Sequence, residues 1–185
     1  MRTEERWGKT FERNCIIHHF PPRLAKDLFE LNLPRNPVED VSSLFIFGKV
    51  KTGKTIRAAQ LLVQQRMFDY INNIERTTLF VSFPELFAEI RDTYNNSKIT
   101  EKEVLDKYLN VDFLIIDDFL TAKPTEWVME VLYRLINYRY ENLKKTIITS
   151  NLSLEEIENV LQDQRITSRI DRMCIIEEKQ SYKTT

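Results

Sequence analysis

The sequence predicts an α/β fold, in which a mostly parallel sheet of five strands has helices on both faces. Short apolar runs rich in β-branched and aromatic residues alternate with longer segments of helical periodicity along most of the 185-residue chain. This alternation is typical of parallel sheets, whose strands are joined by helical crossovers. One run, at residues 111–116, is almost wholly apolar, as expected of a strand that is buried on both faces. The length suits one compact domain.

The strands and helices follow one another in a regular order. The predicted strands cover residues 44–47, 78–82, 111–116, 146–150 and 174–176. The predicted helices cover residues 24–31, 54–70, 84–94, 101–109, 126–143, 154–161 and 165–172. Thr100, Thr125 and Ser153 each precede a helix as N-cap residues, and Pro84 opens the first turn of another. We expect residues 1–40, which hold four of the six prolines, to form a lead segment before a core at 41–185.

Composition limits the classes of function. The 27 basic and 28 acidic side chains nearly cancel, so any contact with nucleic acid must come from a local patch or from an assembled ring. The apolar runs are too short to span a membrane, and we expect no secretory signal and a cytoplasmic location. The two cysteines, Cys15 and Cys174, are expected to be reduced thiols, because only His18 and His19 could join them in a zinc site.

A glycine-framed loop joins the first predicted strand to the helix after it. The loop reads Gly48-Lys49-Val50-Lys51-Thr52-Gly53-Lys54-Thr55, which is the G-x-x-x-x-G-K-T pattern of a phosphate-binding P-loop. In this pattern the backbone N–H groups surround the phosphates, and glycine lets the backbone approach them closely. Lys54 is expected to reach the β- and γ-phosphates, and the Thr55 hydroxyl to bind Mg²⁺. The side chains of Lys49 and Lys51 either contact phosphate or, as the simpler expectation, stay solvated.

Two carboxylates end the third predicted strand. Asp117 and Asp118 follow the apolar residues 113–116, and carboxylates are costly beside a buried strand unless they face a site. Ligands of open α/β sheets bind at the C-terminal ends of the strands. We expect Asp117 to hold Mg²⁺ through water and Asp118 to orient and polarise the attacking water. The alternative is an acidic turn without ligand.

Polar residues also end the fourth predicted strand and fill a segment near the C-terminus. Asn151 follows strand 146–150 and can hold the attacking water beside the γ-phosphate, although asparagine also ends strands in ordinary turns. Arg165 and Arg169 lie four residues apart and share one helix face. Their guanidinium groups suit a triphosphate, in the same chain or from a neighbour. The alternative is a solvated basic face paired with Asp171 and Glu158.

These motifs together resemble the AAA+ ATPases of the DnaC/DnaI helicase-loader group and the related IstB transposition helpers. The resemblance covers about residues 20–183 and extends to Pro21-Pro22-Arg23 and to the closing Gln180-Ser181-Tyr182-Lys183. It implies a P-loop NTPase core that binds ATP and Mg²⁺, hydrolyses ATP and assembles side by side with the nucleotide between subunits. It also implies that Arg169, or else Arg165, reaches the neighbour's γ-phosphate, and that the partner is a replicative DNA helicase placed on single-stranded DNA.

The chain departs from that group at both ends. About 40 residues precede the first strand, so we expect the helicase-gripping N-terminal domain of the group to be missing or reduced. Sixteen residues follow Arg169, so we expect the helical lid domain to be absent or truncated. A transposition helper, or an adaptor that is switched by ATP and hydrolyses little, therefore stays open beside a helicase loader. A P-loop small-molecule kinase is less favoured, because the paired aspartates and the Ser-Asn strand end suit attack by water.

A mixed aromatic and basic segment between the second and third strands is the candidate for single-stranded DNA. It contains Phe83, Phe87, Arg91, Tyr94 and Lys98, and stacking plus phosphate contact is how proteins hold single strands. The two phenylalanines have helical spacing and are expected to be core residues instead, which leaves the charged residues open.

Overall fold

The five strands form one parallel sheet in the order β2-β3-β4-β1-β5. The computed structural model describes residues 20–31, 39–95, 99–120 and 123–180. The strands are β1 (Leu44–Gly48), β2 (Thr78–Ser82), β3 (Phe113–Asp117), β4 (Lys145–Ser150) and β5 (Ile175–Lys179). Every neighbouring pair runs parallel, so the C-terminal ends of all five strands lie along one edge. The predicted fold class is therefore confirmed.

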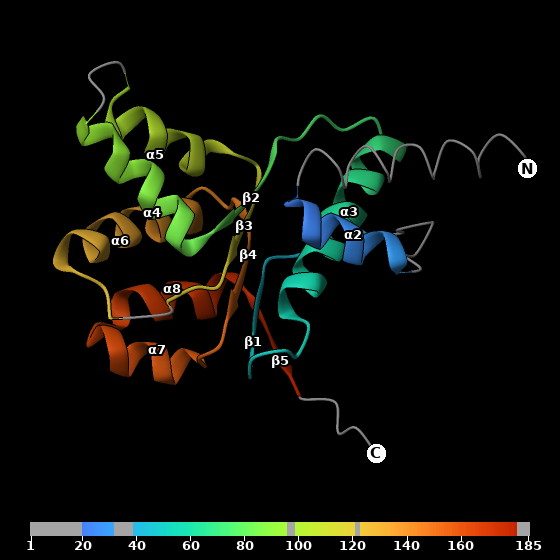
Figure 1. The fold of residues 1–185 in the computed structure, drawn as a ribbon. Helices are drawn as coiled ribbons and strands as arrows, with labels where there is room; N and C mark the ends of the chain where they lie inside the picture. Colours follow the sequence, from blue (N-terminus) through green and yellow to red (C-terminus); the bar gives the residue numbers. More distant parts are fainter. Residues whose placement is uncertain (1–19, 32–38, 96–98, 121–122, 181–185) are drawn as a thin grey trace, which may run out of the picture.

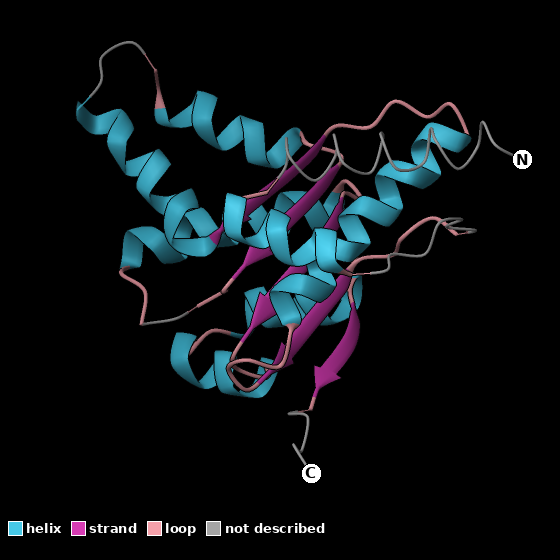
Figure 2. Ribbon diagram, turned by 45° about the vertical axis from the view of Figure 1, so that its right-hand side comes forward, coloured by secondary structure: helices cyan, strands magenta, loops and turns pink. Residues whose placement is uncertain are grey.

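Helices cover both faces of the sheet (Figure 1). They are α2 (Pro22–Glu30), α3 (Lys54–Ile71), α4 (Phe83–Asp92), α5 (Glu101–Asn110), α6 (Glu126–Glu141), α7 (Leu154–Leu161) and α8 (Gln164–Met173), with a 3₁₀ turn η1 (Thr93–Asn95). In Figure 1, α2 and α3 lie on one face, and α4 to α8 lie on the other. Figure 2, turned by 45°, shows the sheet running between these two layers. Two hydrophobic clusters fill the spaces between the sheet and each layer.

The strand order places β1 between β4 and β5, so the chain leaves β1 for the far edge of the sheet and returns. Such a reversal opens a crevice at the C-terminal ends of the strands, where α/β proteins bind ligands. The loop after β1, the end of β3 and the end of β4 all lie at this edge. The topology alone therefore brings the three predicted motifs to one place.

Helix α2 packs on α3 through Leu24, Ala25 and Leu28, which are all buried. The first described residues thus share the core on this face of the sheet. The proposed boundary at residue 40 between a lead segment and the core stays a prediction. None of the described helices is long and apolar enough to cross a membrane.

Several element ends differ from the sequence prediction. The third strand begins at Phe113 rather than at residue 111, because the Val111 N–H bonds to Lys107 O and closes α5. The last strand runs from Ile175 to Lys179, where 174–176 was predicted. Helix α4 ends at Asp92 and continues as the 3₁₀ turn. Cys174 is a free and buried thiol, whereas Cys15, His18 and His19 lie outside the described residues.

Candidate nucleotide-binding site

The G-x-x-x-x-G-K-T segment forms the connection from β1 to α3, as predicted. Gly53 is the N-cap of α3 and has a left-handed backbone, with φ of 81°. Lys51 also has positive φ, at 66°, a conformation that is rare for residues with a side chain. The side chains of Lys49, Val50 and Lys51 are exposed, consistent with the expectation that the two lysines are solvated. The turn leads directly into the N-terminus of an 18-residue helix, where backbone N–H groups are free to bind an anion.

Position 48 admits only glycine, because the backbone of a neighbouring strand leaves no room for a Cβ. Its φ is 147°, and a Cβ built at this position would lie 2.2 Å from Lys179 O in β5. We expected the glycine to admit phosphate, but its close neighbour here is the edge strand. The close packing of β5 against Gly48 therefore excludes a side chain at the first residue of the P-loop.

The Lys54 ammonium lies inside the loop. Its Nζ donates hydrogen bonds to Gly48 O at 2.8 Å and to Lys49 O at 2.9 Å, and the residue is 6% exposed. Burial lowers the pKa of Lys54, while the charges of Asp118 and Asp117 oppose that shift. The neutral carbonyls that hold the ammonium leave its charge free for a phosphate group.

Asp117 joins the P-loop to β4 by hydrogen bonds. The Thr55 hydroxyl donates to Asp117 Oδ2 at 3.1 Å, and the Thr149 hydroxyl donates to Asp117 Oδ1 at 2.6 Å. Burial raises the pKa of Asp117, and these two hydrogen bonds counter the shift. The hydroxyl and the carboxylate predicted to serve Mg²⁺ are therefore in direct contact, and oxygen ligands of this kind suit that ion.

Asp118 sits on a backbone that β4 fixes. It has φ of 54° and an exposed side chain, and its N–H donates to Thr149 Oγ1 at 3.0 Å. The next residue, Phe119, donates its N–H to Thr149 O at 2.8 Å and accepts from the Ser150 hydroxyl at 2.8 Å. The carboxylate of Asp118 thus projects from a left-handed turn that three hydrogen bonds to Thr149 and Ser150 hold in place.

Asn151 follows the last residue of β4, at the same edge of the sheet as Asp118. Its side chain is exposed and forms no hydrogen bond with any described residue. The position agrees with the sequence prediction, and its role stays a prediction.

Arg165 and Arg169 lie on α8, which packs against α6. Arg165 donates to both carboxylate oxygens of Asp163, at 2.7 to 3.1 Å. Arg169 instead donates to neutral acceptors, namely the side chains of Asn137 and Tyr133 and the carbonyl of Arg165. In the described part of the chain neither arginine forms an ion pair with Asp171 or Glu158, the partners named in the alternative of a solvated basic face.

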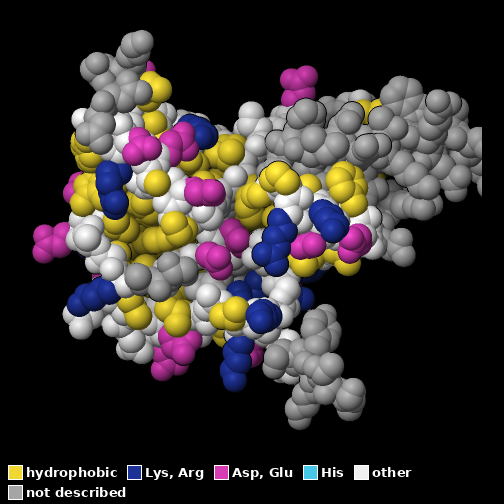
Figure 3. Space-filling view, viewed as in Figure 1, with side chains coloured by type: hydrophobic (Ala, Val, Ile, Leu, Met, Phe, Trp, Pro, Cys, Tyr) yellow, Lys and Arg dark blue, Asp and Glu magenta, His cyan; other side chains and the backbone are white. Residues whose placement is uncertain are grey.

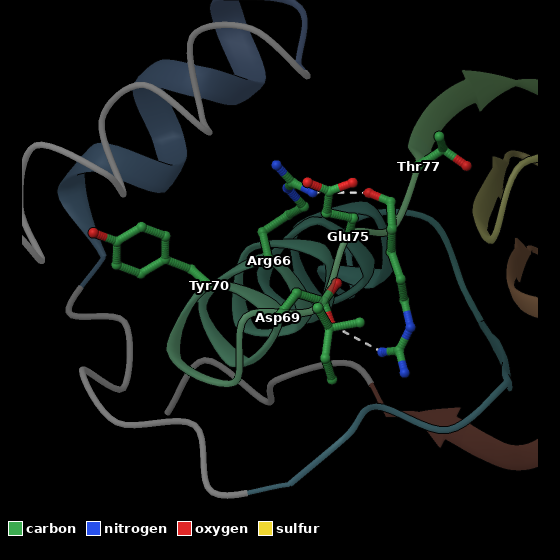
Figure 4. Close-up of a pocket in the computed structure, with 7 residues that line it drawn as sticks. Arg66, Asp69, Tyr70, Glu75 and Thr77 are labelled. Atoms are coloured by element: carbon green, nitrogen blue, oxygen red, sulfur yellow. Dashed lines mark hydrogen bonds and ion pairs between the residues drawn. The ribbon is translucent and has the colours of Figure 1, made fainter.

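A separate pocket of about 480 Å³ lies at the other end of α3 (Figure 4). It is lined by charged residues that bind one another: Arg76 donates to Asp69 Oδ1 at 2.9 Å, and Arg66 donates to Arg76 O. Asp69 is fifteen residues beyond Lys54 on α3, which is about 22 Å along a helix. This pocket is therefore distinct from the nucleotide edge.

The fold and this edge define a P-loop nucleotide-binding protein of the AAA+ type. The model of the IstB-like ATP binding protein family matches residues 17–181, so the chain belongs to that family. The replicative helicase loader DnaC of Escherichia coli (strain K12) is 22% identical over 175 residues, covering 92% of this chain and 69% of that protein.

Two solved structures share the fold. The DnaC helicase loader superposes with a TM-score of 0.61 at 22% identity, over 88% of this chain and 93% of that one. The replication initiator DnaA bound to AMPPCP and single-stranded DNA gives 0.59 at 21% identity, over 86% of this chain and 46% of that one. The chain thus spans nearly the whole of one neighbour and less than half of the other.

Three residues of the site were not assigned a role from the sequence. Thr149 was noted only as part of a strand end, and Tyr133 and Asn137 were noted only as parts of a helix. For Thr149 the usable signal is a hydroxyl at the penultimate position of the strand that pairs with the strand of Asp117. No signal marks the other two, because their contacts with Arg169 join residues that are 32 and 36 positions apart on different helices.

Proposed function

We propose that this protein binds and hydrolyses Mg²⁺-ATP, and that it acts in DNA replication by loading the replicative helicase onto single-stranded DNA. One observation carries the enzymatic part of the proposal. Thr55, Asp117 and Thr149 form a continuous set of hydrogen bonds beside the buried Lys54 ammonium. A phosphate-binding cation, two oxygen ligands for Mg²⁺ and the exposed Asp118 carboxylate therefore meet at one edge of the sheet.

In this proposal the eight P-loop residues from Gly48 to Thr55 hold the triphosphate. Backbone N–H groups at the start of α3 bind its oxygens, and Lys54 exchanges the loop carbonyls for the β- and γ-phosphates. Thr55 and, through water, Asp117 would hold Mg²⁺, which would supply positive charge beside the phosphates. Burial favours this exchange, because an ammonium and an anion attract more strongly away from water.

Hydrolysis is assigned to Asp118 and Asn151. The Asp118 carboxylate forms no ion pair with any described residue, so it can orient and polarise the attacking water from the turn that β4 holds in place. Asn151, whose amide forms no hydrogen bond within the described segments, holds the same water from the neighbouring strand end. The paired aspartates and the Ser-Asn strand end suit attack by water, which disfavours a P-loop kinase.

Arg169 is assigned as the arginine finger, acting on the γ-phosphate of a neighbouring subunit in a self-assembled form. The alternative, Arg165, already has its charge neutralised by three hydrogen bonds to Asp163. Arg169 is bound only by neutral acceptors and forms no ion pair with a described carboxylate. Its charge is therefore available to a phosphate, and such a residue stabilises charge in phosphoryl transfer.

The replication role rests on the family and on the DnaC relative, which this chain matches over 92% of its own length. We infer a cytoplasmic protein whose partner is the replicative helicase. An IstB-like transposition helper and an ATP-switched adaptor with little hydrolysis are the alternatives. They differ in measurable ways, since the first requires a transposase partner and the second requires that loss of Asp118 leave ATP turnover unchanged.

A candidate surface for single-stranded DNA lies where α4 and η1 meet the start of α6. Phe83 and Phe87 are buried core residues, as expected, and Lys98 lies outside the described residues. The exposed Tyr94 ring packs 6.1 Å from Trp127, and the Arg91 guanidinium lies 5.8 Å from that ring. Hydrophobic side chains gather on the side of the molecule that carries these helices (Figure 3). An aromatic pair beside a guanidinium suits base stacking with phosphate contact.

The test is a binding assay between the purified protein and purified replicative helicase hexamer, with ATP, with ADP and without nucleotide. Helicase retained in an ATP-dependent manner supports the loader role. Lys54→Ala is the matched control, because it removes the phosphate-binding ammonium and should abolish ATP binding and the nucleotide dependence. Failure to retain helicase under every condition, with a transposase retained instead from extract, would favour the transposition helper.

A further inference from the structure

The Arg169 guanidinium is held by three neutral groups at once. Its Nε donates to Asn137 Oδ1, its Nη1 to Arg165 O at 2.7 Å and its Nη2 to Tyr133 Oη at 3.3 Å. Its Cζ also lies 5.0 Å from the centroid of the Tyr133 ring, within the range of a cation–π contact. Tyr133 and Asn137 are four residues apart on α6, so they share one helix face and form a single cradle.

Within the described part of the chain Arg169 forms no ion pair with a carboxylate, and Asp163, which pairs with Arg165, attracts the Arg169 charge only from a longer distance. Four other described arginines, Arg57, Arg76, Arg134 and Arg165, each form an ion pair. Arg169 does not, although Arg165 one turn before it takes Asp163 and also lies 4.8 Å from the Tyr133 ring. A half-buried guanidinium that is fixed in place by neutral acceptors keeps its attraction for an anion and has already lost its rotamer freedom.

We propose that Tyr133 and Asn137 are positioning residues that hold Arg169 in the orientation in which it meets the γ-phosphate of the neighbouring subunit. This inference rests on the proposed ATPase function and on the finger role of Arg169. The proposal requires an uncharged side chain at position 137. A carboxylate there would form an ion pair with the Arg169 guanidinium and weaken its attraction for the γ-phosphate. Arg165 completes the cradle with its carbonyl, and Asp163 keeps the Arg165 charge from competing.

A purely structural role for these contacts predicts the opposite outcome for one substitution. If Arg169 only joins α8 to α6, then Asn137→Asp replaces a neutral hydrogen bond with an ion pair. The thermal stability should then stay the same or rise, and ATP turnover should not change. If the cradle presents Arg169 to a phosphate, Asn137→Asp maintains the same stability and lowers turnover. Thermal unfolding and ATP turnover measured together therefore separate the two roles.

The experiment uses mixed assemblies of full-length chains. Lys54→Ala subunits bind no ATP but present Arg169, and Arg169→Ala subunits bind ATP but present no finger, so a mixture is expected to regain turnover. Adding Asn137→Asp to the Lys54→Ala subunit should lower the regained kcat by about tenfold or more, a part of the 10³ to 10⁵ that such an arginine supplies. The matched control places Asn137→Asp in the Arg169→Ala subunit, where no guanidinium remains to be withheld, and no further loss is expected.

Tyr133 is tested in the same mixtures. Tyr133→Phe keeps the ring and loses one hydrogen-bond acceptor, whereas Tyr133→Leu loses both contacts, so the regained kcat should fall in the order Tyr, Phe, Leu with KM for ATP unchanged. An equal loss from Asn137→Asp in either subunit, or no loss in the Lys54→Ala subunit, overturns the inference. A parent protein without ATP turnover overturns the proposed function itself, and this inference with it.

Discussion

The Thr149 hydroxyl donates a 2.6 Å hydrogen bond to Asp117 Oδ1 and accepts another from the Asp118 N–H at 3.0 Å. Thr149 of β4 therefore orients the side chain of Asp117, which is assigned to Mg²⁺. It also fixes the backbone of Asp118, whose side chain is assigned to the attacking water. Groups that hydrogen-bond to a metal ligand orient that ligand and tune the metal site.

Thr149→Val keeps the shape of the side chain and removes both hydrogen bonds. We expect a loss of about 10- to 100-fold in ATP turnover or in Mg²⁺ affinity, the usual effect of removing such a group. Thr149→Ser retains the hydroxyl and should stay near the parent. Steady-state ATP hydrolysis at varied Mg²⁺ concentration measures both, and a valine variant with parental kinetics would remove Thr149 from the site.

The affinity for Mg²⁺-ATP should fall as the pH is lowered, and at a higher pH than an ordinary aspartate would cause. Burial raises the pKa of Asp117, so its protonated form persists to higher pH, and only the ionised form can serve the cation. ATP binding measured across the acidic range, with Mg²⁺ and with a chelator, checks this. The Mg²⁺-dependent part of the affinity should carry the pH dependence and should lose it in Asp117→Asn.

Arg139 should be among the most stabilising polar residues of the chain. Its fully buried guanidinium donates to the carbonyls of Tyr108, Val111 and Lys145 and to the Thr146 hydroxyl. Arg139→Met leaves several of these acceptors without a partner at about 1–3 kcal/mol each, so the free energy of unfolding should fall by about 3 kcal/mol or more.

Denaturant unfolding of Arg139→Met measures that loss. The matched control is Arg134→Met on the same helix, where the arginine is exposed and pairs with Glu101 at 3.6 Å. Its loss should change the free energy of unfolding by less than about 1 kcal/mol. Equal stability of the two variants would show that the carbonyls around Arg139 find other partners.

The sequence predicted the order and type of every described strand and helix, because apolar periodicity and cap residues are local signals. Thr100 and Ser153 each form a capping box at the predicted helix start, and Thr125 caps its helix as well. The last strand was placed too early, because Glu177, Glu178 and Lys179 do not read as a strand. At the edge of the sheet they pair with β1 on one side only, and Glu177 pairs with Arg57 and Lys179.

The site residues that are neighbours in the sequence could be predicted. The contacts between segments that are far apart in the sequence could not. The P-loop and the paired aspartates could be identified from local pattern, and the structure places Thr55 and Asp117 in direct contact. The clash that demands glycine at position 48 comes from Lys179, 131 residues away. The choice between Arg165 and Arg169 likewise depends on Asp163 and on a different helix, α6.

The most direct test of the central claim is ATP hydrolysis by the parent protein and by Asp118→Asn, each measured over a range of protein concentration, with ATP binding measured alongside. We expect the ATP turnover rate of the parent protein, per subunit, to rise with protein concentration as subunits assemble. We expect Asp118→Asn to bind ATP with near-parental affinity and to hydrolyse little of it, because Asp118 acts on the attacking water. Equal turnover by the two proteins would contradict the assigned mechanism.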